Sequence, residues 1–272
     1  MRIEQSQIER WLREDLGHHD VTNEVPGETT GRLVATEPGV LAGLEAAAAV
    51  FEYLGVDIES RRSAGDAVEA GETVLRVSGA ASDVLCGERV AVNIAGHASG
   101  VATKTRTAVE RARAVAPDVA IAGTRKTTPG LRGVEKRAIA AGGGDTHRLD
   151  LSHMVMVKDN HIAEMGVETA IERFREQASF ATQIEAEAET AEMAVAAAEA
   201  GADIVLLDNM SPSETADAAA AVPDGTLTEA SGGITLDDVV DYAGTGVDII
   251  SLGSLTHSAA ALDFSFRTGG DR

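Results

Sequence analysis

The sequence predicts an α/β fold whose C-terminal part alternates strands with helices. From residue 118 onward, six apolar runs of β type are separated by helical segments, a pattern typical of parallel strands joined by right-handed crossovers. The runs are nearly continuous in Val, Ile and Leu, as expected when both faces of a parallel sheet are covered. At 272 residues and 44% hydrophobic content, the chain is long enough for one large domain or two modest ones.

The first third of the chain mixes helices with short strands. Four apolar residues at helical spacing predict an amphipathic first helix: Ile8, Trp11, Leu12 and Leu16. Short strands punctuated by Gly and Pro are expected over 31–44, 56–63 and 71–79. Helices are expected over 44–54 and, in an Ala-rich stretch, over about 82–116.

The six later strands end in polar or glycine residues. We predict these strands over 119–124, 153–158, 181–189, 202–208, 226–231 and 247–253. In α/β barrels the functional groups lie at the carboxyl ends of the strands, and phosphate often binds at the last two. Glycine-rich turns follow the last two strands here. A doubly wound open sheet remains an alternative, but the strand ends favour an incomplete six-strand barrel.

Composition excludes several classes of function. The formal charge is −21, with 44 acidic and 23 basic residues, so the surface should repel nucleic acids and anionic membranes. Only four of the basic residues are lysines, and such an acidic, lysine-poor chain suggests adaptation to high salt, which screens self-repulsion. A single cysteine, no long apolar stretch and no signal-like N-terminus lead us to expect a cytoplasmic protein.

Positive charge is nevertheless concentrated in one segment. Residues 124–158 contain seven basic and three acidic residues, a net charge of +4, which leaves −25 on the rest of the chain. Such a cluster indicates either a site for a multiply charged anion or an ion-paired surface, and composition leaves both open. Arg132, Lys136 and Arg137 follow the TTPG turn on a helical segment, where we expect a solvated face.

Several motifs, in order along the chain, together resemble those of the quinolinate phosphoribosyltransferase family. They are EDLGHHDVT (14–22), ERVAVN and SGVATKTR (88–106), GTRKTTPGLRGVEKRAIAAGGGDTHR (123–148), MVKDNHI (156–162), IEAEAET (184–190), IVLLDN (204–209), EASGGI (229–234) and GVDIISLGSLTHS (246–258). The resemblance implies a pentosyltransferase of NAD biosynthesis. Its reaction joins phosphoribosyl pyrophosphate to quinolinate, and gives nicotinate mononucleotide, CO₂ and pyrophosphate.

The same resemblance assigns roles to individual residues. The quinolinate dicarboxylate would lie among Arg125, His147, Arg148 and Lys158. Thr124 would also bind substrate. Lys126 and Lys158 would meet the pyrophosphate, and Glu187 and Asp208 would meet the ribose hydroxyls and Mg²⁺. Glu185 shares a strand face with Glu187, and the family pattern selects Glu187. The 5′-phosphate would bind the backbone of Ser231, Gly232, Gly233, Leu252, Gly253 and Ser254. We expect Lys126, Lys158, Glu187 and Asp208 to be catalytic.

The resemblance also implies a domain division and a homodimer. An N-terminal α/β sandwich would cover 1–105 and the barrel 106–260, with the tail 261–272 packing back on the first domain. Arg106 would enter the site of a neighbouring subunit, and assembly beyond a dimer stays open. Two alternatives remain: a related phosphoribosyltransferase with another pyridine or a molybdenum-pathway acceptor, and a barrel lyase that uses a Schiff-base lysine.

Overall fold

The computed structural model describes residues 3–269, and contacts within it divide the chain into two units. One unit contains 1–106, 128–143 and 258–272, and the other contains 107–127 and 144–257. Residues 1, 2 and 270–272 of the first unit, including the end of the expected tail, lie outside the described residues. No helix within 3–269 combines the length and apolar character needed to cross a bilayer.

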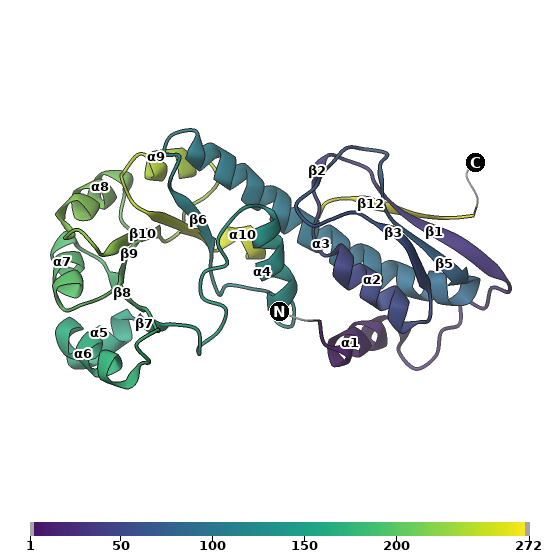
Figure 1. The fold of residues 1–272 in the computed structure, drawn as a ribbon, viewed down its shortest axis with the longest axis horizontal. Coiled ribbons are helices and arrows are strands. Elements are labelled where there is room, and N and C mark those ends of the chain that lie inside the picture. Colours follow the sequence, from purple (N-terminus) through teal and green to yellow (C-terminus); the bar gives the residue numbers. More distant parts are fainter. Residues whose placement is uncertain (1–2, 270–272) are drawn as a thin grey trace. The chain divides into compact units, whose positions relative to one another are not determined.

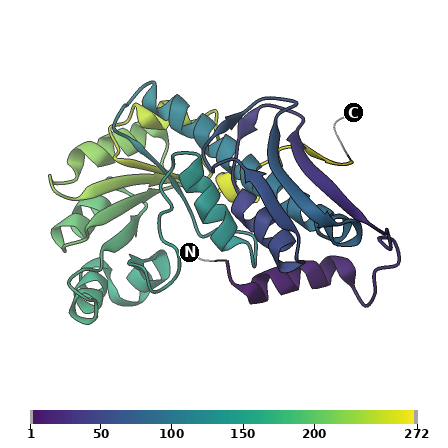
Figure 2. The same ribbon diagram turned by 45° about the vertical axis from the view of Figure 1, so that its right-hand side comes forward.

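The first unit is a four-stranded antiparallel sheet covered by helices. The sheet order is β12-β1-β5-β3, formed by Phe264–Thr268, Glu28–Ala35, Thr73–Ala80 and Asp57–Arg61. A small ladder pairs β2 (Gly39–Val40) with β4 (Ala67–Val68). Helices α2 (Leu44–Tyr53) and α3 (Ala81–Arg113) lie along one face of the sheet in Figures 1 and 2. Leu33, Phe51 and Leu75 are buried between these layers, which confirms the α/β sandwich.

A second core in this unit joins α1 (Gln5–Leu16) and α4 (Arg132–Ala141) to α2 and α3. Ile8 and Leu12 are buried on α1, as the spacing predicted, and Val134 and Ile139 are buried on α4. The expected barrel boundary of 106–260 had placed α4 in the other domain. The solvated face expected on this helix is wrong for Lys136, which is only 1% exposed, because α4 packs into this core.

The second unit is a six-stranded parallel sheet with the order β6-β11-β10-β9-β8-β7. Its strands, in chain order, are β6 (Ala120–Gly123), β7 (Val155–Val157), β8 (Ile184–Ala188), β9 (Ile204–Asp208), β10 (Leu227–Ser231) and β11 (Ile249–Leu252). All six fall within the predicted ranges, so the strand prediction is confirmed. Because the sheet curls without a ladder between β6 and β7 among the described residues, the barrel is incomplete.

Short helices follow the strands β7 to β11. They are α5 (Asp159–Met165), α6 (Val167–Gln177), α7 (Ala191–Glu199), α8 (Pro212–Ala221), α9 (Val239–Ala243) and α10 (Ser254–His257). Of these, α6, α7 and α8 lie on the outer side of the sheet (Figure 1). The core between sheet and helices is aliphatic and includes Ile171, Val205 and Leu207. Parallel strands aligned in this way bring their carboxyl ends to one edge.

Candidate active site

A cavity of about 710 Å³ lies where the parallel strands of the second unit end. Most of the predicted site residues line it, although they come from six different strand ends or loops. They are Thr124, Arg125, Lys126, His147, Arg148, Lys158, Glu187, Asp208, Ser231, Gly232 and Gly233. The barrel therefore gathers groups that lie up to 109 positions apart in the sequence.

Two arginines, Arg125 and Arg148, line this cavity. Arg148 is 6% exposed, and its Nη2 donates to the Met156 sulfur at 3.4 Å. The Nε atoms of Arg125 and Arg148 are buried, and neither has a hydrogen-bond partner among residues 3–269. Burial and the charge of Arg125 lower the pKa of the Arg148 guanidinium. Because both Nε atoms are closed off from solvent, a ligand in the cavity would reach these arginines through their Nη groups. Two like charges that act against each other in one cavity are typical of a site for an anion.

The lysines are held by the ends of the neighbouring strands. Lys158, directly after β7, forms an ion pair with Glu187 on β8. Its side chain is about half exposed, unlike the desolvated lysine that a Schiff base requires. The carbonyl of Lys126 accepts a hydrogen bond from the Thr256 hydroxyl at 2.6 Å, which fixes the backbone of its loop and leaves an exposed side chain at the rim.

Glu187 and Asp208 lie at the ends of adjacent strands. Glu187 is in register with Leu206, and Asp208 follows two residues later on the same strand face. Burial raises the pKa of the Asp208 carboxyl, and the charge of Glu187 raises it further. Two oxygen ligands whose charges repel each other suit Mg²⁺, which typically takes one or two carboxylates together with phosphate oxygens. These residues therefore fit the expected metal.

The turn after β10 is built for close approach of another group. Gly232 and Gly233 have φ values of +101° and +66°. A Cβ on Gly232 would lie 2.4 Å from the Asn209 side-chain oxygen, so only glycine fits there. Asn209 itself has φ +57° and donates its backbone N–H to the Ser231 carbonyl at 3.0 Å. Such a turn can direct backbone N–H groups at a phosphate.

Four predicted residues do not line the cavity formed by the described part of the chain. Leu252 is buried in the core of the barrel. Gly253 packs against the Lys126 side chain, which lies 2.9 Å from the position of an added Cβ, and Ser254 begins α10. Arg106 lies on α3 in the first unit, where its Nε and Nη2 donate to the carbonyls of Gly142 and Ala141 at 3.0 and 3.4 Å.

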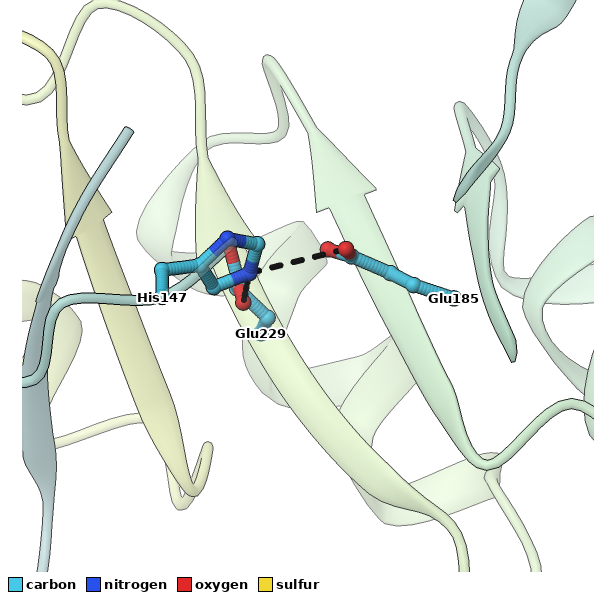
Figure 3. Close-up of side chains that lie close together, drawn as sticks. All are labelled: His147, Glu185 and Glu229. Atoms are coloured by element: carbon cyan, nitrogen blue, oxygen red, sulfur yellow. Dashed lines mark hydrogen bonds and ion pairs between the residues drawn. The ribbon is translucent and has the colours of Figure 1, made fainter. Parts of the chain in front are cut away.

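His147 connects the cavity to two buried acids (Figure 3). Its Nε2 lies 3.1 Å from Glu229 Oε2 and 3.5 Å from Glu185 Oε2, and both carboxylates are almost completely buried. Burial lowers the pKa of His147, but the contacts with the two carboxylates outweigh it and raise the pKa to about 10. Burial raises the pKa of Glu185, as does the charge of Glu229.

Sequence reasoning missed the part that Glu229 and Glu185 play. Glu229 stands inside the quoted EASGGI motif without an assigned role, although an acid in the middle of a buried strand is itself a signal. Glu185 and Glu187 do share a face of β8, and the structure separates them by depth. Glu187 lines the cavity, whereas Glu185 is fully buried below it and faces His147.

Comparison with known proteins finds relatives that match nearly the whole chain. The model of the quinolinate phosphoribosyl transferase C-terminal domain matches residues 101–267, and that of its N-terminal domain matches residues 20–99. A probable nicotinate-nucleotide pyrophosphorylase (carboxylating) of Methanothermobacter thermautotrophicus is 44% identical, covering 97% of this chain and 98% of that protein. The human nicotinate-nucleotide pyrophosphorylase (carboxylating) is 43% identical, covering 96% of this chain and 90% of that protein.

Solved structures agree with the sequence comparisons. The crystal structure of NadC from Streptococcus pyogenes superposes with a TM-score of 0.91 at 37% identity and covers 99% of both chains. The nicotinate-nucleotide pyrophosphorylase of Ehrlichia chaffeensis gives a TM-score of 0.91 at 33% identity, covering 99% of this chain and 100% of that one. With both domains matched and the cavity at the expected strand ends, the chain belongs to the quinolinate phosphoribosyl transferase family.

Proposed function

We propose that this protein transfers the phosphoribosyl group of phosphoribosyl pyrophosphate to quinolinate and forms nicotinate mononucleotide, pyrophosphate and CO₂. The observation that carries the proposal is that Arg125 and Arg148 line one cavity, where the charge of Arg125 acts against that of Arg148. In a molecule with a formal charge of −21, two such guanidinium groups side by side are best explained by an anionic ligand. The excess of negative charge on the chain as a whole makes a general anion-binding role a poor alternative.

Quinolinate would bind on the basic side of the cavity. A planar guanidinium holds a carboxylate through two parallel hydrogen bonds, so Arg125 and Arg148 can bind and orient an aromatic diacid. His147 and Lys158 line the same cavity and add positive charge. The four groups would fix the plane of the pyridine ring, and its nitrogen would then face the sugar.

Phosphoribosyl pyrophosphate would lie across the opposite strand ends. Lys126 and Lys158 would contact the pyrophosphate, and Glu187 and Asp208 the ribose hydroxyls. The turn Ser231–Gly232–Gly233 would contact the 5′-phosphate through backbone N–H groups, with support from the backbone of Leu252, Gly253 and Ser254 at the next strand end.

Catalysis would then rest on position and charge. The pyridine nitrogen attacks C1 of ribose as the bond from C1 to the pyrophosphate oxygen breaks, and the leaving group carries away the electron pair. Lys126 and Lys158 stabilise the charge that develops on the pyrophosphate, while Glu187 and Asp208 stabilise the cationic sugar. Holding both substrates in line supplies much of the remaining acceleration.

Decarboxylation follows from the charge on the product. Once the ring nitrogen is quaternary, it withdraws electrons from the adjacent carbon, so CO₂ leaves more easily and a proton takes its place. Bound Mg²⁺ would neutralise charge on the pyrophosphate, with Glu187 and Asp208 as its protein ligands. No protein group has to move a proton during the transfer step, so we propose that these side chains act by binding and electrostatics.

A product assay tests the proposal. The protein is incubated with phosphoribosyl pyrophosphate, Mg²⁺ and either quinolinate or nicotinate, and nicotinate mononucleotide and CO₂ are measured. We expect product and equimolar CO₂ from quinolinate and none from nicotinate. Product from nicotinate alone would replace the proposal with a related phosphoribosyltransferase.

We also propose that the active protein is a homodimer in which Arg106 reaches the neighbouring subunit's substrate. Two of the guanidinium nitrogens of Arg106 already bind the carbonyls at the end of α4, and the remaining donors could contact a ligand. Co-expressed Arg106→Ala and Lys158→Ala subunits should regain up to about a quarter of wild-type activity if the sites are shared. Intact dimers without recovery would exclude this role for Arg106, and sedimentation would show which species was assayed.

We further propose that the enzyme is cytoplasmic, and its charge balance supports adaptation to high salt. With −21 on 272 residues, self-repulsion destabilises the folded state at low ionic strength and is screened as salt increases. The melting temperature should therefore rise between 0.1 and 2 M KCl more steeply than that of a relative with balanced charge.

A further inference from the structure

The imidazole of His147 lies between two carboxylates inside the barrel, as Figure 3 shows. Glu229 comes from β10 and Glu185 from β8, on either side of β9, and both approach the same ring nitrogen. The distances from Nε2 are 3.1 Å to Glu229 and 3.5 Å to Glu185. The side chains of Glu229 and Glu185 are 1% and 0% exposed, and that of His147 is 10% exposed, so the contacts are buried.

This arrangement determines which hydrogens the ring carries. An ionised carboxylate only accepts hydrogen bonds, so Nε2 must be a donor. A neutral ring protonated on Nε2 would leave a lone pair on Nδ1, which would repel an anionic ligand. Two carboxylates at one nitrogen instead favour the imidazolium, in which Nδ1 also carries a hydrogen. His147 lines the cavity, and the contacts of its side chain all involve Nε2, so among residues 3–269 Nδ1 has no partner and its hydrogen would be free for a ligand.

The backbone fixes the ring in place. His147 has φ +50°, a conformation that residues other than glycine rarely adopt. Its N–H donates to the Asp145 carboxylate at 2.6 Å, and Asp145 is bridged to Ala122 of β6. A strained residue held at both its backbone and its ring is typical of a functional position.

We propose that Glu229 and Glu185 are positioning residues that hold His147 as an oriented imidazolium, whose Nδ1–H donates to one carboxylate of quinolinate. The proposal deepens the proposed function and rests on it for the identity of the ligand. The four acids of the barrel would then have two roles. Glu187 and Asp208 contact the ribose, whereas the more deeply buried Glu185 and Glu229 act on quinolinate only through His147.

Glu229 supports the charge of the ring most directly, because it is the closer carboxylate and because burial and the charge of Glu229 raise the pKa of Glu185. Despite burial, the two carboxylates raise the pKa of His147 to about 10, so the ring keeps its charge at neutral pH. The charged or titratable groups around it, on its own loop, on the strand ends and at the far end of the barrel, are Arg125, Asp145, Arg148, His153, Lys158, Glu185, Glu187 and Glu229.

A metal ion is the competing occupant. Ligand atoms of His147, Glu185 and Glu229 lie within 4.8 Å of one another, and one imidazole with two carboxylates could bind a divalent cation. Arg148 argues against it, since its charge already acts on Glu185 and would repel a dication. A proton on the imidazole gives the same carboxylates a positively charged partner and adds one positive charge instead of two.

The test combines spectroscopy with kinetics. Protein labelled with ¹⁵N-histidine is titrated from pH 6 to 9, and the His147 signals are assigned among the seven histidines with a His147→Gln variant. In the wild type we expect both ring nitrogens to stay protonated across this range. In Glu229→Gln the ring should titrate near its ordinary value of about 6.5. KM for quinolinate should then rise at least tenfold between pH 6 and 8.5, while KM for phosphoribosyl pyrophosphate changes less than twofold.

Matched variants keep the outcome interpretable. Glu199→Gln removes the same charge from an exposed position on α7 and should leave both readouts unchanged. If Glu229→Gln does not fold, Glu185→Gln should give the same but smaller shift. Wild-type His147 that titrates near pH 6.5, or a stoichiometric metal ion in the purified protein, would overturn the inference. A doubly protonated His147 in a protein that makes no product from quinolinate would instead remove the proposed function.

Discussion

Replacing Arg148 by methionine should weaken quinolinate binding without destabilising the fold. Arg148 is 6% exposed and its Nε has no partner among the described residues. Burial and the like charge of Arg125 act against its cation, and only Glu185 and Glu187 support it. The free protein therefore carries a guanidinium that its own fold stabilises poorly, and the proposed substrate carboxylate would complete the site.

The substitution should weaken quinolinate binding but slightly stabilise the fold. A hydrogen bond to a charged group contributes about 1.5–3 kcal/mol, so losing the guanidinium should raise KM for quinolinate by roughly 10- to 150-fold. Replacing a whole buried ion pair by apolar side chains is often neutral or stabilising by about 1–4 kcal/mol, whereas removing one partner of a balanced pair destabilises the fold. Arg148 is not balanced, because burial and the charge of Arg125 lower its pKa despite the support from Glu185 and Glu187. Since Glu185 and Glu187 already offset part of the cost, we expect the lower end, about 1 kcal/mol. That corresponds to roughly 2–4 °C in melting temperature.

Steady-state kinetics and thermal unfolding of the same preparation measure both effects. Arg173→Met, which removes an exposed arginine on α6, is the control and should change neither quantity. The reasoning would be refuted if Arg148→Met lowered the melting temperature by several degrees, because the guanidinium would then stabilise the fold. It would be refuted equally if KM for quinolinate stayed within threefold of the wild type.

Three further predictions concern the other side of the cavity, the turn and the pH dependence. Asp208→Asn should lower kcat by about 100-fold with an unchanged fold by circular dichroism, and a loss under fivefold would exclude a role in the transition state. Gly232→Ala should raise KM for phosphoribosyl pyrophosphate more than KM for quinolinate and lower the melting temperature, because its Cβ would meet Asn209; equal changes in both KM values would argue against the phosphate turn. The raised pKa of His147, about 10 in the folded protein against about 6.5 unfolded, gives stabilisation that is complete below pH 6.5 and is lost as pH rises through 10. Melting temperatures between pH 7 and 10 should therefore fall more in the wild type than in Glu229→Gln, and parallel curves would contradict this origin.

The barrel could be predicted from sequence because its signal is local. Each parallel strand is a short apolar run bounded by turns, so all six were found within their ranges. The polar residues that follow these runs also pointed to the cavity, since parallel strands bring their ends to one edge. Neither step needed contacts between distant residues.

Other features depend on tertiary packing and leave little local signal. Lys136 has the sequence environment of a surface helix, yet α4 packs against α1, α2 and α3 and buries it. Leu252 was expected at the phosphate through its backbone, whereas its side chain belongs to the core.

The partners of His147 illustrate the same limit within the site. Glu185 and Glu229 stand on strands separated by β9, 44 positions apart in the sequence, and meet only after the sheet curls. Spacing along one strand could not tell Glu185 from Glu187, because both point to the same face.

Calorimetric titration of quinolinate and of nicotinate, with and without pyrophosphate, tests the central claim most directly. If fixed cations in this cavity hold both carboxylates of the acceptor, quinolinate should bind at least 100-fold more tightly than nicotinate, and Arg148→Met should reduce that ratio to under about tenfold. Equal affinity of the wild-type protein for the two acids would contradict the account.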